Sequence, residues 1–228
     1  MLFRRIAALL ASYLALFRFS LERSCYKNNI KYSCVSKKYR FIYFRVPKSA
    51  NTTVISSLLS NDLEKDKSGT RKDVFDKLTA LNFENTKDYT VFTVVRNPYT
   101  RVLSAYLQKI VEKGSKRHFI EKEGDVSFED FISWLENGGL NKNGHWQPQN
   151  KIVPLSFSSL VTVKMENLEA ELNPLLKKIN ENMKIKSRQS HGTGSDGLIS
   201  DYYTPELASR VYALYQEDFK RFGYDRSL

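Results

Sequence analysis

Residues 41–60 read FIYFRVPKSANTTVISSLLS, and this stretch decides the fold. An apolar, β-branched run ends at Val46, Pro47 stops it, and a helix-like run follows a turn of small and hydroxyl-bearing residues. A strand that turns into a helix presents backbone N–H groups and the positive end of the helix dipole to a bound anion. We therefore predict a phosphate-binding loop. Its residues carry small, polar or positively charged side chains: Lys48, Ser49, Ala50, Asn51, Thr52 and Thr53.

This loop differs from the one that binds nucleoside triphosphates. That loop has the pattern G-x-x-x-x-G-K-[ST], in which the last hydroxyl holds magnesium. Residues 41–60 contain no Gly, Lys48 stands at the start of the turn, and no predicted strand ends in a magnesium-binding Asp. A P-loop-like nucleotide kinase or other phosphotransferase is therefore the alternative interpretation. If this segment is taken alone, it could also be an ordinary strand–turn–helix whose Lys lies on the surface and binds no ligand.

A second segment, residues 89–109, reads YTVFTVVRNPYTRVLSAYLQK. Thr90–Val95 is a continuous β-branched and aromatic run, the pattern of a strand buried on both faces of a parallel sheet. It ends at Arg96, and Asn97 and Pro98 begin a helix that carries Ser104. A guanidinium and a hydroxyl so placed suit a second anionic group. Arg96 could instead pair with a carboxylate.

The rest of the chain continues this alternation. Strands are predicted at residues 39–46, 90–95 and 160–165, and helices at about 51–60, 98–113, 128–136, 168–180 and 205–222. The order predicts a three-layer α/β fold with a central parallel sheet flanked by helices, and a ligand at the carboxyl ends of the strands. We expect an N-terminal extension over residues 1–35 and one domain over residues 36–228.

At the two anion-binding segments the sequence resembles the sulfotransferases. VPKSANTT at 46–53 is similar to their 5′-phosphosulfate loop, and VVRNPYTRVLSAY at 94–106 is similar to their 3′-phosphate element, R-[DN]-P-x-x-R-x-x-S-x-Y. These two motifs are most similar to those of the carbohydrate sulfotransferase branch, often called sulfotransferase family 2. HWQPQ at 145–149, VKMENLEAEL at 163–172 and the segment 191–224 extend the resemblance.

The resemblance implies a P-loop-like sulfotransferase fold and a donor, 3′-phosphoadenosine 5′-phosphosulfate (PAPS). Its sulfuryl group would pass in line, without a metal, to a hydroxyl of a carbohydrate: a polysaccharide, a glycolipid or a glycoprotein glycan. Lys48 would stabilise the charge that grows on the departing phosphate. Arg96 and Ser104 would hold the 3′-phosphate, and Arg188 would reach that phosphate or the adenine. Arg101 could be a further contact of the donor, but we expect it to form a salt bridge on the helix surface.

The acceptor hydroxyl also needs a general base. His145 is the first candidate, because it lies in a loop beside Trp146, which could stack on a sugar face. His145 could instead fix its loop through a backbone hydrogen bond. His191 is the rival base. Three carboxylates are further alternatives: Asp125, Glu129 and Glu166. Of these, Glu166 is expected instead to orient a neighbour or to cap the helix that follows.

Composition narrows the classes of partner. The chain has 228 residues with 41% hydrophobic content, which suits one ordered domain and argues against disorder. A net charge of +11 favours anionic partners. No basic tail or nucleic-acid-binding motif occurs, so we predict no nucleic-acid partner. Cys25 and Cys34 fit no standard zinc pattern, and we expect free thiols, or a local disulfide if the chain is secreted.

The N-terminus carries a short apolar run, IAALLASYLALF, between Arg5 and Arg18. It is shorter than the roughly 20 residues that a membrane-spanning helix needs, and no clear cleavage site follows. Peripheral membrane contact through residues 2–20 and packing on the domain are both open. We expect a cytoplasmic, membrane-associated enzyme. The alternatives are a Golgi enzyme held by a short signal anchor, and a nucleotide-binding homologue without activity.

Overall fold

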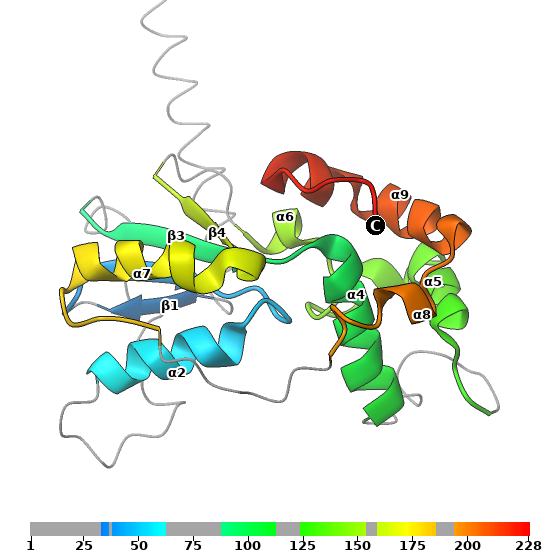
Figure 1. Ribbon diagram of the computed structural model, residues 1–228, viewed down its shortest axis with the longest axis horizontal. Helices are drawn as coiled ribbons and strands as arrows, with labels where there is room; N and C mark the ends of the chain where they lie inside the picture. Colours follow the sequence, from blue (N-terminus) through cyan, green and yellow to red (C-terminus); the bar gives the residue numbers. More distant parts are fainter. Residues whose placement is uncertain (1–32, 37, 63–87, 113–123, 154–158, 186–193) are drawn as a thin grey trace, which may run out of the picture.

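A computed structural model of the protein describes residues 33–36, 38–62, 88–112, 124–153, 159–185 and 194–228 (Figure 1). The apolar N-terminal run, Cys25, Arg188 and His191 lie outside these residues, so the predictions made for them stay predictions. In this part of the chain, none of the helices combines the length and the apolarity that crossing a lipid bilayer requires.

The described strands form one mixed sheet in the order β1-β2-β3-β4. They are β1 (Ser33–Ser36), β2 (Phe41–Phe44), β3 (Thr90–Val95) and β4 (Val161–Lys164). β2, β3 and β4 are parallel, whereas β1 is antiparallel to β2. The three predicted strands are thus parallel as expected, and β1, which was not predicted, adds an antiparallel edge because residues 37–40 are too few for a parallel crossover. β1 also brings residues 33–35, assigned above to the N-terminal extension, into the sheet.

Helices α2 (Asn51–Asp62) and α7 (Leu168–Ile179) pack against one face of this sheet (Figure 1). Because side chains alternate along a strand, Tyr43, Phe92 and Val163 share that face and pack with the two helices. The other face carries its own buried cluster: Val35, Ile42, Phe44 and Val91. The predicted α/β architecture, a central sheet with flanking helices, is confirmed.

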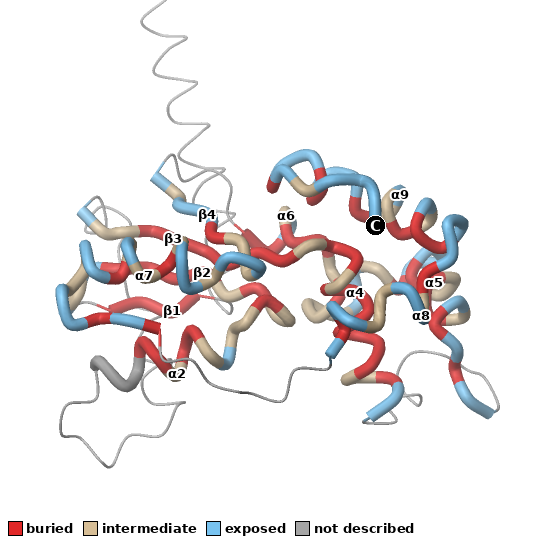
Figure 2. Tube along the Cα trace, in the orientation of Figure 1, coloured by how far each residue is buried: buried red, intermediate tan, exposed pale blue. Residues whose placement is uncertain are grey.

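A second group of helices lies beyond the carboxyl ends of the parallel strands (Figure 1). It contains α4 (Pro98–Tyr106), its π-helical continuation η4 (Leu107–Glu112), α5 (Phe128–Glu136), α8 (Ile199–Tyr202) and α9 (Pro205–Phe222). Three short elements complete the described helices: η6 (Gly139–Asn141), α6 (Gln149–Ile152) and η7 (Met165–Asn167). Figure 2 shows α4 buried along most of its length, because it lies between the sheet and the other helices.

Local signals set most element ends correctly. Ser127 caps α5 in a reciprocal capping box with Asp130, and Thr204 accepts a hydrogen bond from Leu207 N–H at the start of α9. Two predictions need correction. The helix predicted over 98–113 becomes π-helical after Tyr106. β4 is the sheet's other edge among the described strands, so Val161 is 40% exposed rather than buried.

Candidate active site

The loops that follow β2 and β3 meet at the carboxyl ends of two adjacent parallel strands. Phe44 pairs in register with Thr93, so that Lys48 and Arg96 leave the sheet at nearly the same level. Arg96 Nη1 then donates a hydrogen bond of 3.1 Å to the carbonyl oxygen of Lys48. The two predicted anion-binding elements therefore form a single site, in the place where parallel α/β sheets bind ligands.

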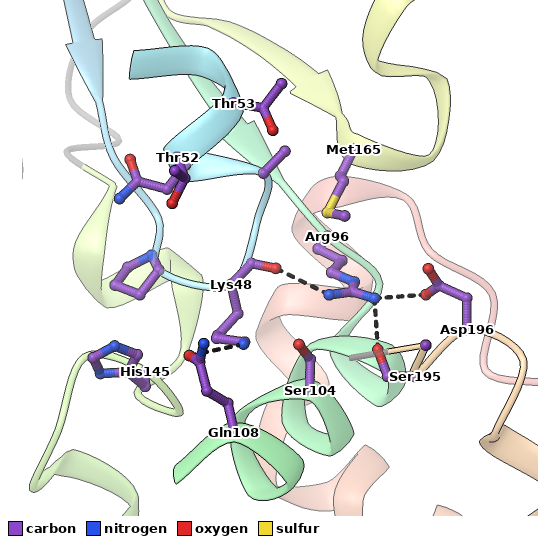
Figure 3. A pocket seen from close by; sticks show the side chains of 14 residues that line it. Lys48, Thr52, Thr53, Arg96, Ser104, Gln108, His145, Met165, Ser195 and Asp196 are labelled. Atoms are coloured by element: carbon purple, nitrogen blue, oxygen red, sulfur yellow. Dashed lines mark hydrogen bonds and ion pairs between the residues drawn. The ribbon is translucent and has the colours of Figure 1, made fainter. Parts of the chain in front are cut away.

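A cavity of about 400 Å³ lies at this edge (Figure 3), a size typical of small-molecule sites. Eight of its lining residues were predicted site residues: Lys48, Ala50, Asn51, Thr52, Thr53, Arg96, Ser104 and His145. The sequence analysis missed the others: Pro47, Gln108, Met165, Gly194, Ser195 and Asp196. Among the described residues, the cavity thus gathers every predicted site residue except Ser49.

Ser49 points into the protein instead of into the cavity. Its side chain is fully buried, and its hydroxyl donates to Gln149 Oε1 at 3.4 Å. Its backbone N–H donates to the carbonyl oxygen of Val46 at 3.3 Å. In this structure both donors of Ser49 therefore close the turn, and its contact with an anion stays a prediction.

The Lys48 turn holds an unusual backbone conformation. Lys48 and Ala50 have φ values of 73° and 50°, in the left-handed region that residues with a Cβ rarely adopt. Strain of this kind persists where the surroundings enforce it, often at binding sites. The Lys48 ammonium donates to Gln108 Oε1 at 3.1 Å. Gln108 lies on the π-helical turn η4, so this irregular turn places a polar acceptor opposite the cation.

The Arg96 guanidinium is the most buried cation of the cavity lining, with 6% of its side chain exposed. Its Nε donates to Thr100 Oγ1 at 3.0 Å. Its Nη2 donates to Ser195 Oγ at 2.8 Å and to the carboxylate of Asp196 at 2.7 Å (Figure 3). Arg96 thus lines the cavity and pairs with a carboxylate, the alternative that the sequence left open, while its contact with an anion stays a prediction. The Asp196 oxygen contacts the guanidinium that would hold an anionic ligand.

Gln149 clamps the two loops behind the cavity. Its side-chain amide accepts the N–H of Arg96 at 2.9 Å and donates to the Arg96 carbonyl oxygen at 2.8 Å. Its own N–H and that of Asn150 donate to the two carboxylate oxygens of Asp218, at 2.7 and 2.8 Å. Burial raises the pKa of the Asp218 carboxyl, and these two N–H donors oppose the rise. From the sequence, Gln149 was noted only as the last residue of the HWQPQ motif, and this structural role was not predicted.

The prediction that Arg101 forms a salt bridge on the helix surface is wrong. The side chain is fully buried rather than paired on the helix surface. Its three nitrogens donate to backbone carbonyl oxygens of Pro47 (3.0 Å), Gln147 (2.9 Å) and Gly144 (3.0 Å). The reason is tertiary: α4 is enclosed on nearly all sides, so its arginine reaches the loops around the cavity instead of water.

His145 lines the cavity, on the side where Lys48 and Gln108 meet (Figure 3). Asn143 Oδ1 accepts the His145 N–H at 3.0 Å and lies 2.7 Å from the Nδ1 of the same residue. An oxygen that accepts both contacts requires Nδ1 to carry the hydrogen, which leaves the lone pair of the neutral ring on Nε2.

The expectation that Trp146 could stack on a sugar face is wrong. Trp146 is fully buried, its Nε1–H donates to the Gly139 carbonyl oxygen at 3.0 Å, and its ring packs edge-on against Phe131 and Trp134. An indole enclosed in this way cannot stack on a ligand. It anchors the loop that carries His145.

The three carboxylates proposed as alternative bases are not part of the described lining of the cavity. Glu166 accepts the N–H of Asn97 at 2.7 Å and the hydroxyl of Tyr224 at 2.9 Å, which confirms that it orients neighbours. Glu129 lies 3.5 Å from Arg210, and Asp125 is exposed.

Comparison with known proteins identifies the family. A model described as "Sulfotransferase family" matches residues 31–225. The chain belongs to the sulfotransferase family. The match begins just before β1, so the family region includes the antiparallel edge strand. As a sulfotransferase, the protein is an enzyme that takes a sulfuryl group from a sulfate donor.

Curated relatives of this sulfotransferase are similar at low identity. Carbohydrate sulfotransferase 11 of Rattus norvegicus is 24% identical over 239 residues, which cover 86% of this chain and 68% of that protein. Carbohydrate sulfotransferase 14 of Mus musculus is 29% identical over 178 residues, 64% of this chain and 46% of that protein. The carbohydrate sulfotransferase 14 of Danio rerio is 26% identical, covering 87% and 63%. No solved structure matches the chain significantly.

Proposed function

We propose that this sulfotransferase moves a sulfuryl group from PAPS to a hydroxyl of a carbohydrate. The observation that carries the proposal is the single cavity that joins the Lys48 loop to the Arg96 guanidinium. Two cationic groups at neighbouring strand ends suit a nucleotide with two separate phosphate-like groups. The relatives named carbohydrate sulfotransferase 11 and 14 support a carbohydrate acceptor.

The residues of the cavity fit such a donor. The Lys48 ammonium, with the Thr52 and Thr53 groups at the start of α2, would hold the 5′-phosphosulfate, since a helix N-terminus favours negative charge. Arg96 and Ser104 would hold the 3′-phosphate with charge-assisted hydrogen bonds. Arg188, outside the described residues, stays a proposed contact of that phosphate or of the adenine.

The chemistry needs a cation at the leaving group and a base at the acceptor. PAPS supplies a sulfuryl group whose transfer leaves negative charge on the bridging phosphate oxygen. Lys48 would stabilise this growing charge, and Gln108 would hold the ammonium in place until then. His145 would accept the acceptor's proton at Nε2, with its ring oriented by Asn143.

Donor binding is tested with adenosine 3′,5′-bisphosphate (PAP), the product nucleotide. We expect PAP to raise the melting temperature of the protein in the presence of EDTA, whereas Mg·ATP gives a much smaller shift. A stabilisation that requires Mg·ATP would contradict the proposal and favour the kinase alternative. Arg96→Ala should weaken PAP binding by about 2–4 kcal/mol, because a charge-assisted contact is lost.

Turnover is tested by the transfer of labelled sulfate from PAPS to a panel of glycans. Lys48→Ala should reduce kcat more than it reduces PAP affinity, and His145→Ala should abolish turnover while PAP affinity stays intact. The matched control is Lys151→Ala, an exposed lysine that donates to Asn141 and is not part of the cavity lining. Equal losses of turnover and of PAP affinity in Lys48→Ala would contradict the proposed role of Lys48 in the transition state. Full donor binding without turnover on any glycan would favour a non-catalytic homologue.

The place where the enzyme works is a separate proposal. A positively charged, apolar N-terminal segment supports peripheral membrane contact through residues 2–20 on the cytoplasmic side, with the Golgi lumen as the alternative. Protease protection of the full chain in sealed microsomes distinguishes them: a cytoplasmic enzyme is digested, whereas a luminal one survives.

A further inference from the structure

Arg101 is a charged side chain with no exposed surface, on the helix that also carries Ser104. Taking a guanidinium out of water is costly unless its donors are satisfied and a counter-charge is near. The donors go to three carbonyl oxygens, and all three belong to loops around the cavity. The arginine therefore lies behind the site as part of its support.

The three acceptors come from two different loops. Pro47 directly precedes Lys48, whereas Gly144 and Gln147 stand on either side of His145 and Trp146. Because a guanidinium is planar and presents its N–H groups in a fixed fork, it holds these carbonyls in a fixed relative position. One side chain thus joins the loop of the proposed leaving-group cation to the loop of the proposed base.

The same contacts support the backbone of the Lys48 turn. The carbonyl of Pro47 accepts from Arg101, and the next carbonyl, that of Lys48, accepts from Arg96. In a trans peptide the N–H points away from the preceding carbonyl, so the Lys48 N–H is directed away from Arg101. Two arginines from the segment after β3 thereby fix the left-handed conformation of Lys48.

Helix α9 supplies the counter-charge. Burial raises the pKa of the Asp218 carboxyl, and the N–H groups of Asn150 and Gln149 and then the charge of Arg101 oppose this rise. Asp218 accepts two N–H groups at the start of α6, and the Tyr215 hydroxyl donates to the Trp146 carbonyl oxygen. The His145 loop is therefore held from α4 by Arg101 and from α9 by Tyr215 and Asp218.

We propose that Arg101 is a positioning residue, which sets the Lys48 loop and the His145 loop at the separation that in-line transfer requires. It acts through these loops and touches neither donor nor acceptor. The inference rests on the proposed function, because it assigns the leaving-group cation to Lys48 and the base to His145. A misplacement of about 1 Å between reacting groups can reduce the rate roughly 100-fold.

Two variants test the proposal, Arg101→Lys and Arg101→Gln, each of which can reach fewer carbonyls than the guanidinium fork. We expect kcat to fall about 10- to 100-fold while the Kd of PAP changes by about threefold or less, because Arg96 and Ser104 stay in place. The matched control is Arg210→Lys. Arg210 joins α9 to α5 through Glu136, Glu129 and Ser133, so its loss should lower the melting temperature and leave kcat unchanged.

A double-mutant comparison separates positioning from general stability. In the Lys48→Ala background, replacing Arg101 should reduce the residual rate much less than it does in the native chain, since one of the two groups that it aligns is gone. An equal reduction in both backgrounds would overturn the proposal, and so would an unchanged kcat in the two Arg101 variants. If PAP stabilises neither variant, Arg101 is required for folding and the proposal is also overturned. Failure of the native chain to transfer sulfate, or full activity of His145→Ala, would instead overturn the proposed function.

Discussion

Replacing Asp196 by Asn should tighten the binding of PAP. In the structure, the Asp196 carboxylate accepts a hydrogen bond of 2.7 Å from the Arg96 guanidinium. This is the guanidinium that we assign to the 3′-phosphate. An incoming phosphate must displace this carboxylate and then bind close to it. Asn keeps a similar shape and an acceptor oxygen but removes the competing charge.

The magnitude follows from the geometry. Two unit charges about 4 Å apart interact by about 4 kcal/mol at an effective dielectric constant near 20, and by about 1 kcal/mol in water. The Asp196 side chain is 69% exposed whereas that of Arg96 is 6% exposed, so the pair lies between these limits and nearer to water. We expect a gain of about 1 kcal/mol, which corresponds to a roughly fivefold lower Kd.

Isothermal titration calorimetry with PAP, in EDTA at low and high salt, measures this gain. The control is Asp201→Asn, which changes the net charge by the same amount on the exposed start of α8, where Asp201 contacts the Ser200 hydroxyl. The gain in Asp196→Asn should shrink at high salt and should be absent from Asp201→Asn. Weaker PAP binding by Asp196→Asn would refute the reasoning, because it would mean that the carboxylate organises Arg96 for the ligand.

Three further outcomes are expected. Trp146→Ala should lower the free energy of unfolding by about 3–5 kcal/mol, measured by urea denaturation, because it leaves a large cavity; Trp146→Phe should cost much less. Gln108→Leu should lower kcat about fivefold with unchanged PAP affinity, since the Lys48 ammonium loses an acceptor; a loss confined to PAP affinity would contradict this role. Burial raises the pKa of Tyr203 and Tyr215 above the ordinary 10.0, so their stabilisation is complete below pH 10.0 and is lost as the pH rises further. Their tyrosinate absorbance should therefore appear together with the loss of helical circular dichroism, and ionisation of all tyrosines in the folded protein would contradict this.

The elements of the site were predictable because their signals are local. The buried run Thr90–Val95 is β3 residue for residue, and Thr204, Pro205 and Gly223 mark the ends of α9. The two anion-binding turns were also visible, since each is a strand end followed by a helix start. Their meeting in one cavity was the expected consequence of parallel neighbouring strands.

The contacts inside the site were not predictable in the same way. Arg96 and Arg101 are five residues apart and chemically identical, yet one lines the cavity and the other is enclosed. Asp196, the partner of Arg96, lies 100 residues further along the chain. The role of Trp146 was predicted wrongly because a tryptophan can either stack on a sugar face or pack in a core, and its position in the sequence does not distinguish the two.

The sequence by itself determined where the strands, the helices and the two anion-binding turns lie, because periodicity and capping involve neighbouring residues. Tertiary structure decided which side chains reach the ligand, which support the loops, and which strand joins the edge of the sheet. The physical reason is that burial and hydrogen-bond partners depend on segments far apart in the chain. Only their packing shows whether a given charge is exposed to the cavity or satisfied behind it.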